Sequence, residues 1–334
     1  MSLVTVENLS VEYGKAHPTR AVRNVSLQIE ENEFVGLVGE SGCGKSTLGF
    51  AIARLERPPA RIVEGRVIIN DLVWTDMHTE DLLPHRWQDV AIVLQSGMNA
   101  LNPVMSIEFQ FRDVMIQHTR MSSKEILARS YEVLDMVGVP RDALRRYPHE
   151  LSGGMKQRVA IAMAMLLKPQ LIIMDEPTTA LDMVVQRQIL ENLKLLRQQQ
   201  AFSVLFISHD LGVVLELADR VIVMYAGQIV ESQESMNLLH QPMHPYTRAL
   251  LRSLPDAGAT AKTFSGIPGT PPDLGKPVIG CAFAPRCDLA QSACTSSEPE
   301  LLKIGTSQVR CIMTGQEVDR DRINLAGNGA NQSV

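Results

Sequence analysis

The sequence lacks the long apolar segment that a membrane-spanning protein needs. Its longest apolar run, Val159–Leu167, has nine residues, whereas a bilayer crossing takes ~18. The first seven residues contain no basic segment followed by an apolar stretch, so we expect no secretory leader. These absences predict a cytosolic protein that reaches a membrane only by docking on a membrane partner.

Positive charge and cysteine are also scarce. The net charge of −5 provides no broad basic surface, so we expect no nucleic-acid partner. Only five cysteines are present, and four of them lie after residue 280. Structural disulfides are unexpected in a reducing cytosol, so this late group requires another explanation. Its members are Cys281, Cys287, Cys294 and Cys311.

What the chain does contain is an alternation of short apolar strands with helical patterns. Phe34–Val38, Leu171–Met174 and Ser203–Ile207 have the pattern of buried strands. Between about residues 102 and 167 the apolar periodicity becomes helical. This alternation predicts an α/β fold with a mainly parallel sheet and an inserted helical subdomain. After Glu231, proline and glycine become frequent, which indicates a loop-rich C-terminal part.

A glycine-rich loop follows the first of these buried strands. Residues 39–47 read Gly-Glu-Ser-Gly-Cys-Gly-Lys-Ser-Thr and fit the phosphate-loop pattern G-x-x-x-x-G-K-[ST]. The glycines let backbone N–H groups turn toward phosphates, Lys45 places a positive charge on the β and γ oxygens, and the Ser46 hydroxyl ligates Mg²⁺. The predicted nucleotide-contacting residues are Gly39, Ser41, Gly42, Cys43, Gly44, Lys45, Ser46 and Thr47.

An apolar strand further along the chain ends in two acids, Asp175 and Glu176. Alone, such a pair can equally hold a surface turn. With a phosphate loop upstream, Asp175 becomes the expected Mg²⁺ partner, and Glu176 lies where a base orients the attacking water.

The segment Leu151–Arg158 reads Leu-Ser-Gly-Gly-Met-Lys-Gln-Arg and lies between the phosphate loop and the acidic strand. Alone it would be an ordinary turn and helix N-cap. With the other two motifs it resembles the signature of ATP-binding cassette (ABC) ATPases, which close on ATP as a head-to-tail pair. The resemblance implies that Ser152, Gly153, Gly154 and Gln157 serve the nucleotide of the partner cassette.

The resemblance covers roughly residues 3 to 232 and assigns three further positions. Gln95 matches the glutamine that senses Mg²⁺ and couples to the membrane partner, and Asp182 ends the Ala-Leu-Asp of the dimer loop. His209, after a buried strand, matches the switch histidine and would act with Glu176 in hydrolysis. Tyr13 is the candidate aromatic that stacks on adenine, although a strand tyrosine can also simply cover a core edge.

One branch of the family is resembled more closely, the ATPases of dipeptide and oligopeptide importers. Three segments carry this likeness: 95–103, which includes Asn-Ala-Leu-Asn-Pro; 244–247, His-Pro-Tyr-Thr; and 280–287, Gly-Cys-Ala-Phe-Ala-Pro-Arg-Cys. The implied fold is an ABC nucleotide-binding domain over residues 1–232, with an antiparallel β subdomain and a helical subdomain at about 102–167. A small cysteine-containing extension would occupy residues 233–334.

The four late cysteines have the spacing C-x5-C-x6-C-x16-C, which matches neither common zinc knuckles nor common ferredoxins. Four thiolates can still close a shell around Zn²⁺ or hold a [4Fe–4S] cluster. The resemblance to the peptide-importer branch favours the iron–sulfur cluster, with zinc and free thiols as the alternatives.

The resemblance implies an ATP-hydrolysing subunit of an ABC importer. ATP-driven dimerisation of the cassettes would energise the import of di- or oligopeptides. Its partners would be a second ATPase subunit (a second copy or a homologous chain), two transmembrane permeases and, through them, an extracytoplasmic substrate-binding protein. It would lie peripherally on the cytoplasmic face of the inner or plasma membrane. The alternatives are an importer of oligosaccharides or nickel, an exporter ATPase, and a soluble ABC ATPase without transport.

Overall fold

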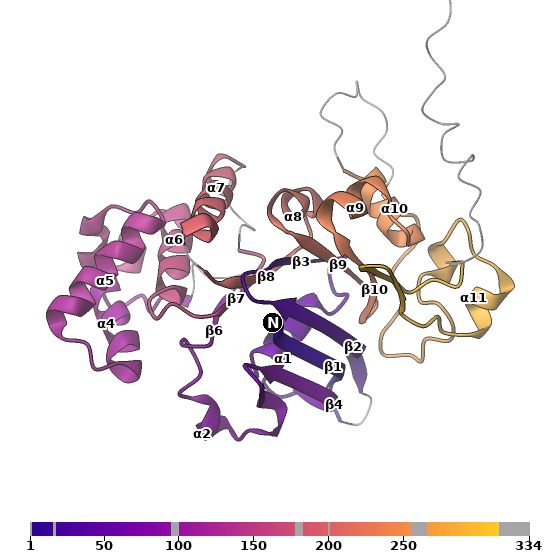
Figure 1. Ribbon diagram of the computed structural model, residues 1–334, viewed down its shortest axis with the longest axis horizontal. Helices are drawn as coiled ribbons and strands as arrows, with labels where there is room; N and C mark the ends of the chain where they lie inside the picture. The colour runs from indigo at the N-terminus through magenta and orange to yellow at the C-terminus, as the bar shows by residue number, and fades with distance from the viewer. Residues whose placement is uncertain are drawn as a thin grey trace, which may run out of the picture.

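The computed structural model describes residues 2–15, 18–94, 100–177, 183–199, 201–254 and 266–313. Among these residues, no helix combines the length and apolar character needed to span a membrane. Two sheets and a group of helices account for most of the fold, and the C-terminal segments pack beside the larger sheet (Figure 1).

The larger sheet has eight strands in the order β11-β12-β10-β9-β3-β8-β7-β6. Its strands β6, β7, β8, β3 and β9 run parallel, and β10, β12 and β11 continue it in antiparallel fashion. This confirms the expected mainly parallel core. The strands are β3 Phe34–Val38, β6 Val90–Val93, β7 Leu171–Asp175, β8 Ser203–Ser208, β9 Arg220–Tyr225, β10 Gln228–Glu234, β11 Leu302–Ile304 and β12 Ser307–Val309.

The smaller sheet is antiparallel, with strand order β2-β1-β4-β5. Its long strands change register at several points, and Asn8 and Asn24 adopt positive φ there, as irregular strand positions often require. The expected antiparallel subdomain is thereby confirmed. Its strands are β1 Ser2–Tyr13, β2 Thr19–Glu30, β4 Ala60–Ile69 and β5 Leu72–Val73, followed by η1 Trp74–Asp76 and α2 Thr79–Leu82.

Two helices cover opposite faces of the central strand β3. Helix α1, Lys45–Ile52, packs between the two sheets, where Leu48 and Ile52 are fully buried. Helix α8, Leu211–Leu217, packs on the other face. A Cβ at Gly36 would lie 2.0 Å from a Val214 methyl group, so the absence of a side chain permits this close helix approach. Both faces of β3 are therefore covered, as a parallel sheet requires.

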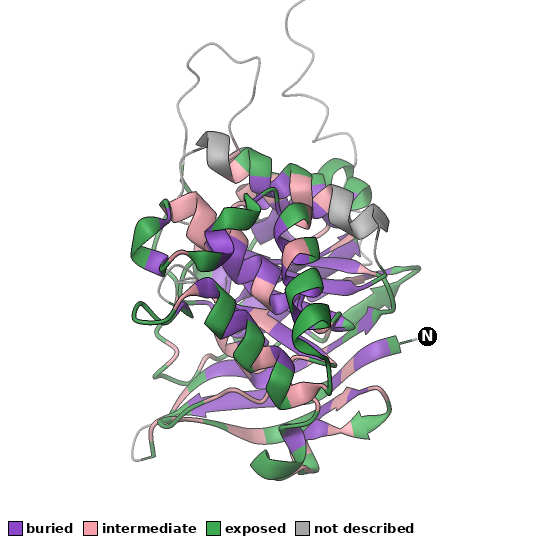
Figure 2. Cartoon of the chain, turned by 90° about the vertical axis from the view of Figure 1, so that its left-hand side faces the viewer, coloured by how far each residue is buried: buried purple, intermediate pink, exposed green. Residues whose placement is uncertain are grey.

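The segment between β6 and β7 is helical, as expected from its periodicity. Figure 2 shows helices on this side with buried and exposed residues interleaved, in front of largely buried strands. The buried Arg129 ties α5 to the end of α6 by donating to the carbonyl oxygens of Leu166 and Met165 at 2.9 and 2.5 Å. The elements here are α4 Ile107–His118, α5 Ser123–Met136, η2 Arg141–Arg145, η3 Pro148–Glu150 and α6 Gly153–Ala164, and α7 Met183–Gln199 follows β7.

The C-terminal segment does not form a separate layer. Strand β12 pairs with β10, placing Val309 opposite Glu231, and Tyr246 and Phe283 belong to the same apolar core as β3 and α8. The boundary expected at residues 232 and 233 lies within β10. The remaining elements are α9 Ser235–His240, α10 Pro245–Arg252, η4 Ala284–Arg286 and α11 Ser292–Ser296.

Candidate nucleotide site

The glycine-rich loop leaves the carboxyl end of β3 and enters α1 at Lys45. Gly44 is the helix N-cap with φ 104°, a left-handed conformation that only glycine adopts readily. A Cβ on Gly44 would lie 2.1 Å from the Ala21 carbonyl oxygen. The loop therefore requires glycine here, and it places the amino end of a helix where an anion binds favourably.

Lys45 is buried at the centre of this loop. Its ammonium group donates to the carbonyl oxygens of Gly39 and Glu40 at 2.8 and 3.0 Å. These bonds hold the cation against the loop backbone, the position that the motif assigns to a phosphate-contacting lysine. Cys43 is also buried, and its burial raises the pKa of the thiol above its ordinary value.

Ser46 and Asp175 meet although 129 residues separate them in sequence. The Ser46 hydroxyl donates to Asp175 Oδ1 at 2.8 Å. Burial is the main cause that raises the pKa of Asp175, and the hydrogen bond from Ser46 opposes that shift. Hydroxyl and carboxylate oxygens are the ligands that Mg²⁺ prefers. The pair therefore fits the expected magnesium site.

Glu176 and His209 form a second pair, at the carboxyl ends of β7 and β8. Glu176 Oε2 lies 2.7 Å from His209 Nδ1. The Glu176 backbone has φ 48°, and its N–H donates to the Ile207 carbonyl oxygen at 2.9 Å. This turn directs the carboxylate to the neighbouring strand end, where the histidine side chain is 61% exposed. The geometry suits a base within reach of solvent.

Tyr13 lies beside the start of α1. Its hydroxyl is 3.0 Å from Thr47 Oγ1, and the residue remains 38% exposed. A ring that is fixed next to the phosphate loop and open to solvent is suited to stacking on a base. The structure thus brings Tyr13 to the loop, as the predicted adenine contact requires.

Ser152 begins α6, where its hydroxyl accepts a hydrogen bond from the Met155 N–H at 3.3 Å. Gly153 and Gly154 form the first turn of the helix, and Gln157 is buried. In Figure 1, α6 lies with the helical group, apart from α1. Within the described ranges, no hydrogen bond or ion pair joins residues 152–157 to residues 39–47. This arrangement is compatible with a role for the signature toward a partner chain.

Gln95 and Asp182, expected at the magnesium site and the cassette interface, lie outside the described residues. The four late cysteines are described and share one region. The Cys281 N–H donates to the Cys294 carbonyl oxygen at 2.8 Å.

The predicted metal site at these cysteines is nevertheless not supported by the structure. Across the described part of the chain, no three His, Cys, Asp or Glu side chains form a group that could hold a metal ion. Burial raises the pKa of Cys281 and raises that of Cys287 to about 11.

One set of contacts at the loop was not expected from the sequence. Arg286 forms a two-pronged ion pair with Glu40, the second residue of the loop, at 2.7 and 2.9 Å. The Glu40 N–H donates to the Tyr246 hydroxyl at 2.9 Å. No spacing or periodicity signal connects positions so distant in sequence. Tyr246 and Arg286 lie in the two C-terminal segments that resemble peptide importers, 244–247 and 280–287, and that likeness is their one signal in the sequence.

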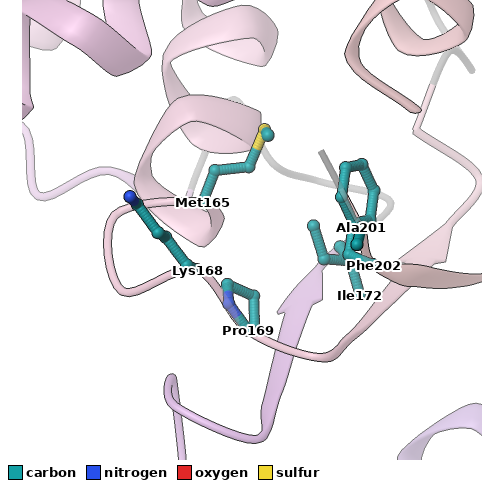
Figure 3. A pocket seen from close by; sticks show the side chains of 6 residues that line it. All are labelled: Met165, Lys168, Pro169, Ile172, Ala201 and Phe202. Carbon is teal, nitrogen blue, oxygen red and sulfur yellow. The ribbon is translucent and has the colours of Figure 1, made fainter. Parts of the chain in front are cut away.

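A small surface hollow lies at the opposite end of the parallel strands, near the starts of β7 and β8. Figure 3 shows its lining side chains, which are Met165, Lys168, Pro169, Ile172, Ala201 and Phe202. The candidate nucleotide residues instead gather at the carboxyl ends of β3, β7 and β8, where α/β sheets bind ligands. The hollow takes no part in the site.

Family models match two parts of the chain. The ABC transporter model matches residues 22–179, and the model for the C-terminal region of oligopeptide/dipeptide transporters matches residues 230–294. The chain is also 42% identical over 322 residues to the oligopeptide transport ATP-binding protein AppD of Bacillus subtilis, covering 95% of this chain and 98% of that protein. The chain belongs to the ABC transporter family, in its oligopeptide/dipeptide branch.

Another relative in this branch is similarly close. The dipeptide transport ATP-binding protein DppD of Haemophilus influenzae is 41% identical, over 93% of this chain and 95% of its own. A solved ATP-binding cassette, dimeric in a post-hydrolysis state with ADP and Pi, aligns with a TM-score of 0.63 and 31% identity. It covers 70% of this chain and 98% of its own. The ABC cassette fold is thereby confirmed.

Proposed function

We propose that this chain hydrolyses ATP to energise an ABC importer of di- or oligopeptides. One observation carries the proposal: Lys45, the Ser46–Asp175 pair and the Glu176–His209 pair all lie at the carboxyl ends of parallel strands. This is the charge and donor arrangement that phosphoryl transfer needs. ATPase activity coupled to transport is the general activity of the family, and the relatives' names support peptides as cargo.

Each residue then has a role in the reaction. The loop N–H groups and Lys45 bind the phosphates of ATP, and Tyr13 stacks on the adenine. Ser46 and Asp175 would hold Mg²⁺, which supplies charge neutralisation on the phosphate oxygens. Glu176 accepts a proton from the attacking water, and His209 orients the Glu176 carboxylate through their 2.7 Å contact.

Two cassettes act together in this proposal. The Ser152–Gly154 turn of one chain would present N–H groups to the ATP held by the other, as helix starts do for anions. ATP favours the closed pair and ADP does not, so the difference in binding supplies the work of transport. Gln95 would contact Mg²⁺ and couple the site to the permeases, and Asp182 would lie at the interface between the two cassettes.

The proposed assembly comprises this chain, a second ATPase subunit and two transmembrane permeases, with an extracytoplasmic binding protein delivering the substrate. The chain would therefore lie on the cytoplasmic face of the membrane through its partners. The proposed division is a cassette over residues 1–232, with the helical subdomain at about 102–167, and an extension over 233–334. An importer of oligosaccharides or nickel would use the same ATPase chemistry.

Copurification and uptake test this function. We expect the tagged chain to be isolated with two integral membrane subunits, and the reconstituted complex to hydrolyse ATP faster when binding protein loaded with a dipeptide is added. Oligosaccharide-loaded binding protein is the matched control. ATP hydrolysis without any membrane partner would favour a soluble ABC ATPase, and outward peptide movement would indicate an exporter.

A [4Fe–4S] cluster held by the four late cysteines is a finer part of the proposal. Its support is the resemblance to the peptide-importer branch, together with the hydrogen bond from the Cys281 N–H to the Cys294 carbonyl oxygen at 2.8 Å, which brings two of the four cysteines, Cys281, Cys287, Cys294 and Cys311, together. The described side chains do not by themselves form a ligand group, so loading would require the sulfurs to converge. No step of ATP hydrolysis depends on it.

Iron analysis after anaerobic purification tests the cluster. We expect brown protein that absorbs near ~400 nm and contains about four iron atoms per chain, and the Cys294→Ser variant should be colourless. Cys43→Ser is the control and should keep the colour, because Cys43 lies in the phosphate loop. Colourless wild-type protein with one zinc would select the zinc alternative, and metal-free protein would leave free thiols.

A further inference from the structure

The C-terminal extension contacts the side chain of one phosphate-loop residue through Arg286. Arg286 Nη1 and Nη2 donate to the two Glu40 carboxylate oxygens at 2.7 and 2.9 Å. The Arg286 side chain is only 4% exposed and Glu40 is 25% exposed. A two-pronged guanidinium–carboxylate pair fixes direction as well as distance. Glu40 therefore has its side chain set by a residue 246 positions away.

The remaining donors of Arg286 are also used. Nη2 donates to the Ile267 carbonyl oxygen at 3.1 Å, and Nε donates to that of Pro268 at 2.8 Å. Nη1 also lies 3.2 Å from the Tyr225 hydroxyl, and the guanidinium is stacked 5.8 Å from that ring's centre. The guanidinium thus joins the 266–268 segment, the η4 turn and the end of β9 to the loop.

A second element of the extension holds the Glu40 backbone. Tyr246, at the start of α10, is fully buried and accepts a hydrogen bond from the Glu40 N–H at 2.9 Å. Its ring packs 4.6 Å from Tyr225 and 5.3 Å from Phe283, centre to centre. The carbonyl oxygen of the same Glu40 accepts from the Lys45 ammonium at 3.0 Å.

We propose that Arg286 is a positioning residue for ATP binding, acting through Glu40 on the geometry of the phosphate loop. The inference rests on the proposed function, because it concerns the same nucleotide site. Arg286 and Tyr246 restrain the side chain and the N–H of one loop residue, whose carbonyl oxygen holds the phosphate-contacting lysine. The extension thereby presets the loop for ATP.

Loss of the guanidinium would release this restraint. A half-buried carboxylate left without its partner turns toward solvent, because an unpaired charge is costly in a partly buried site. The Glu40 backbone, no longer restrained through its side chain, then shifts, and with it move the carbonyl oxygen and the Lys45 ammonium bonded to that oxygen. We expect ATP affinity to fall about 10-fold, the scale of a charged hydrogen bond.

The test is Mg-ATP affinity of the full-length chain, with a double-mutant cycle. Arg286→Ala and Glu40→Ala should each raise the Kd about 10-fold. The double variant should raise it by no more than either single one, because both remove the same interaction. Arg286→Lys should have a Kd between those of wild type and Arg286→Ala, because lysine keeps the positive charge but cannot donate two parallel hydrogen bonds to the carboxylate.

Arg252→Ala is the matched control, because Arg252 belongs to the same extension but pairs with Asp288 at 3.8 Å on the exposed surface. Its Kd should equal that of wild type. Thermal unfolding of every variant is recorded alongside, and Arg286→Lys supplies the affinity measurement if Arg286→Ala does not fold.

Arg286 variants that bind Mg-ATP as wild type does, with lowered thermal stability alone, would reduce Arg286 to a structural tie and overturn the inference. Additive effects in the cycle would overturn the route through Glu40. Wild-type protein that fails to bind Mg-ATP would instead contradict the proposed function, so the two failures are distinguishable.

Discussion

Replacing Glu176 with Gln will slow ATP hydrolysis in the assembled transporter about 100-fold or more while leaving ATP binding intact. The amide has nearly the same shape as the carboxylate but cannot accept the proton of the attacking water. Binding is unaffected because the phosphate contacts come from Lys45 and the loop. The ATP-loaded variant should accumulate as a closed pair of cassettes, measured by its elution volume with Mg-ATP.

A glutamate on the surface provides the control for this substitution. Glu216 pairs with Lys194 at 2.6 Å and is exposed, so Glu216→Gln should hydrolyse ATP at the wild-type rate. Turnover of Glu176→Gln equal to that of this control would remove Glu176 from the role of base. His209→Ala should also slow hydrolysis, because it removes the group that orients Glu176.

The parts of the site carried by strands and their ends could be predicted from the sequence. Phe34–Val38 is uniformly apolar and leads directly into the glycine loop, so β3 and the start of α1 followed from local pattern. Asp175 and His209 each come at or just after an apolar strand. In a parallel sheet the carboxyl ends of neighbouring strands meet, which is why residues far apart in sequence form the two observed pairs.

The C-terminal contacts could not be predicted because they leave no local signal. Strands β11 and β12 are three residues each, too short to show alternation. They join the sheet because β12 pairs with β10 and β11 pairs with β12. Arg286 lies between Pro285 and Cys287 in a loop-rich stretch, where a charged side chain is ordinarily solvated. Its burial depends on Glu40, Tyr225 and two carbonyl oxygens meeting in space, and neither composition nor spacing encodes that meeting.

The proline- and glycine-rich composition after Glu231 predicts a loop-rich extension, and the structure adds that this segment packs on the main sheet. The change in composition is real, but the segment adds strands to the main sheet and side chains to its core. A proline- and glycine-rich stretch indicates few regular elements. It does not indicate how strongly the segment packs against its neighbours.

Replacing Ser152 with Arg will abolish closure of the cassette pair while the isolated chain still binds Mg-ATP with wild-type affinity. The signature turn starts α6, and among the described residues nothing links it to the chain's own phosphate loop. An arginine there would project into the space that the partner's ATP needs. In the Glu176→Gln background, Mg-ATP should therefore leave this variant monomeric on size-exclusion chromatography.

The control for Ser152→Arg is a variant that removes a helix N-cap serine elsewhere and leaves residues 151–158 unchanged. Ser122 also caps its helix, α5, by accepting from the Glu125 N–H, and Glu125 in turn accepts from the Ser122 N–H. Ser122→Arg therefore carries a stability loss of at least about 1 kcal/mol. That variant should still form the closed pair. If Ser152→Arg instead weakened nucleotide binding by the monomer as much as it weakened pairing, the signature would serve its own chain. Only unchanged monomer affinity together with lost pairing fits a turn that contacts the partner's nucleotide.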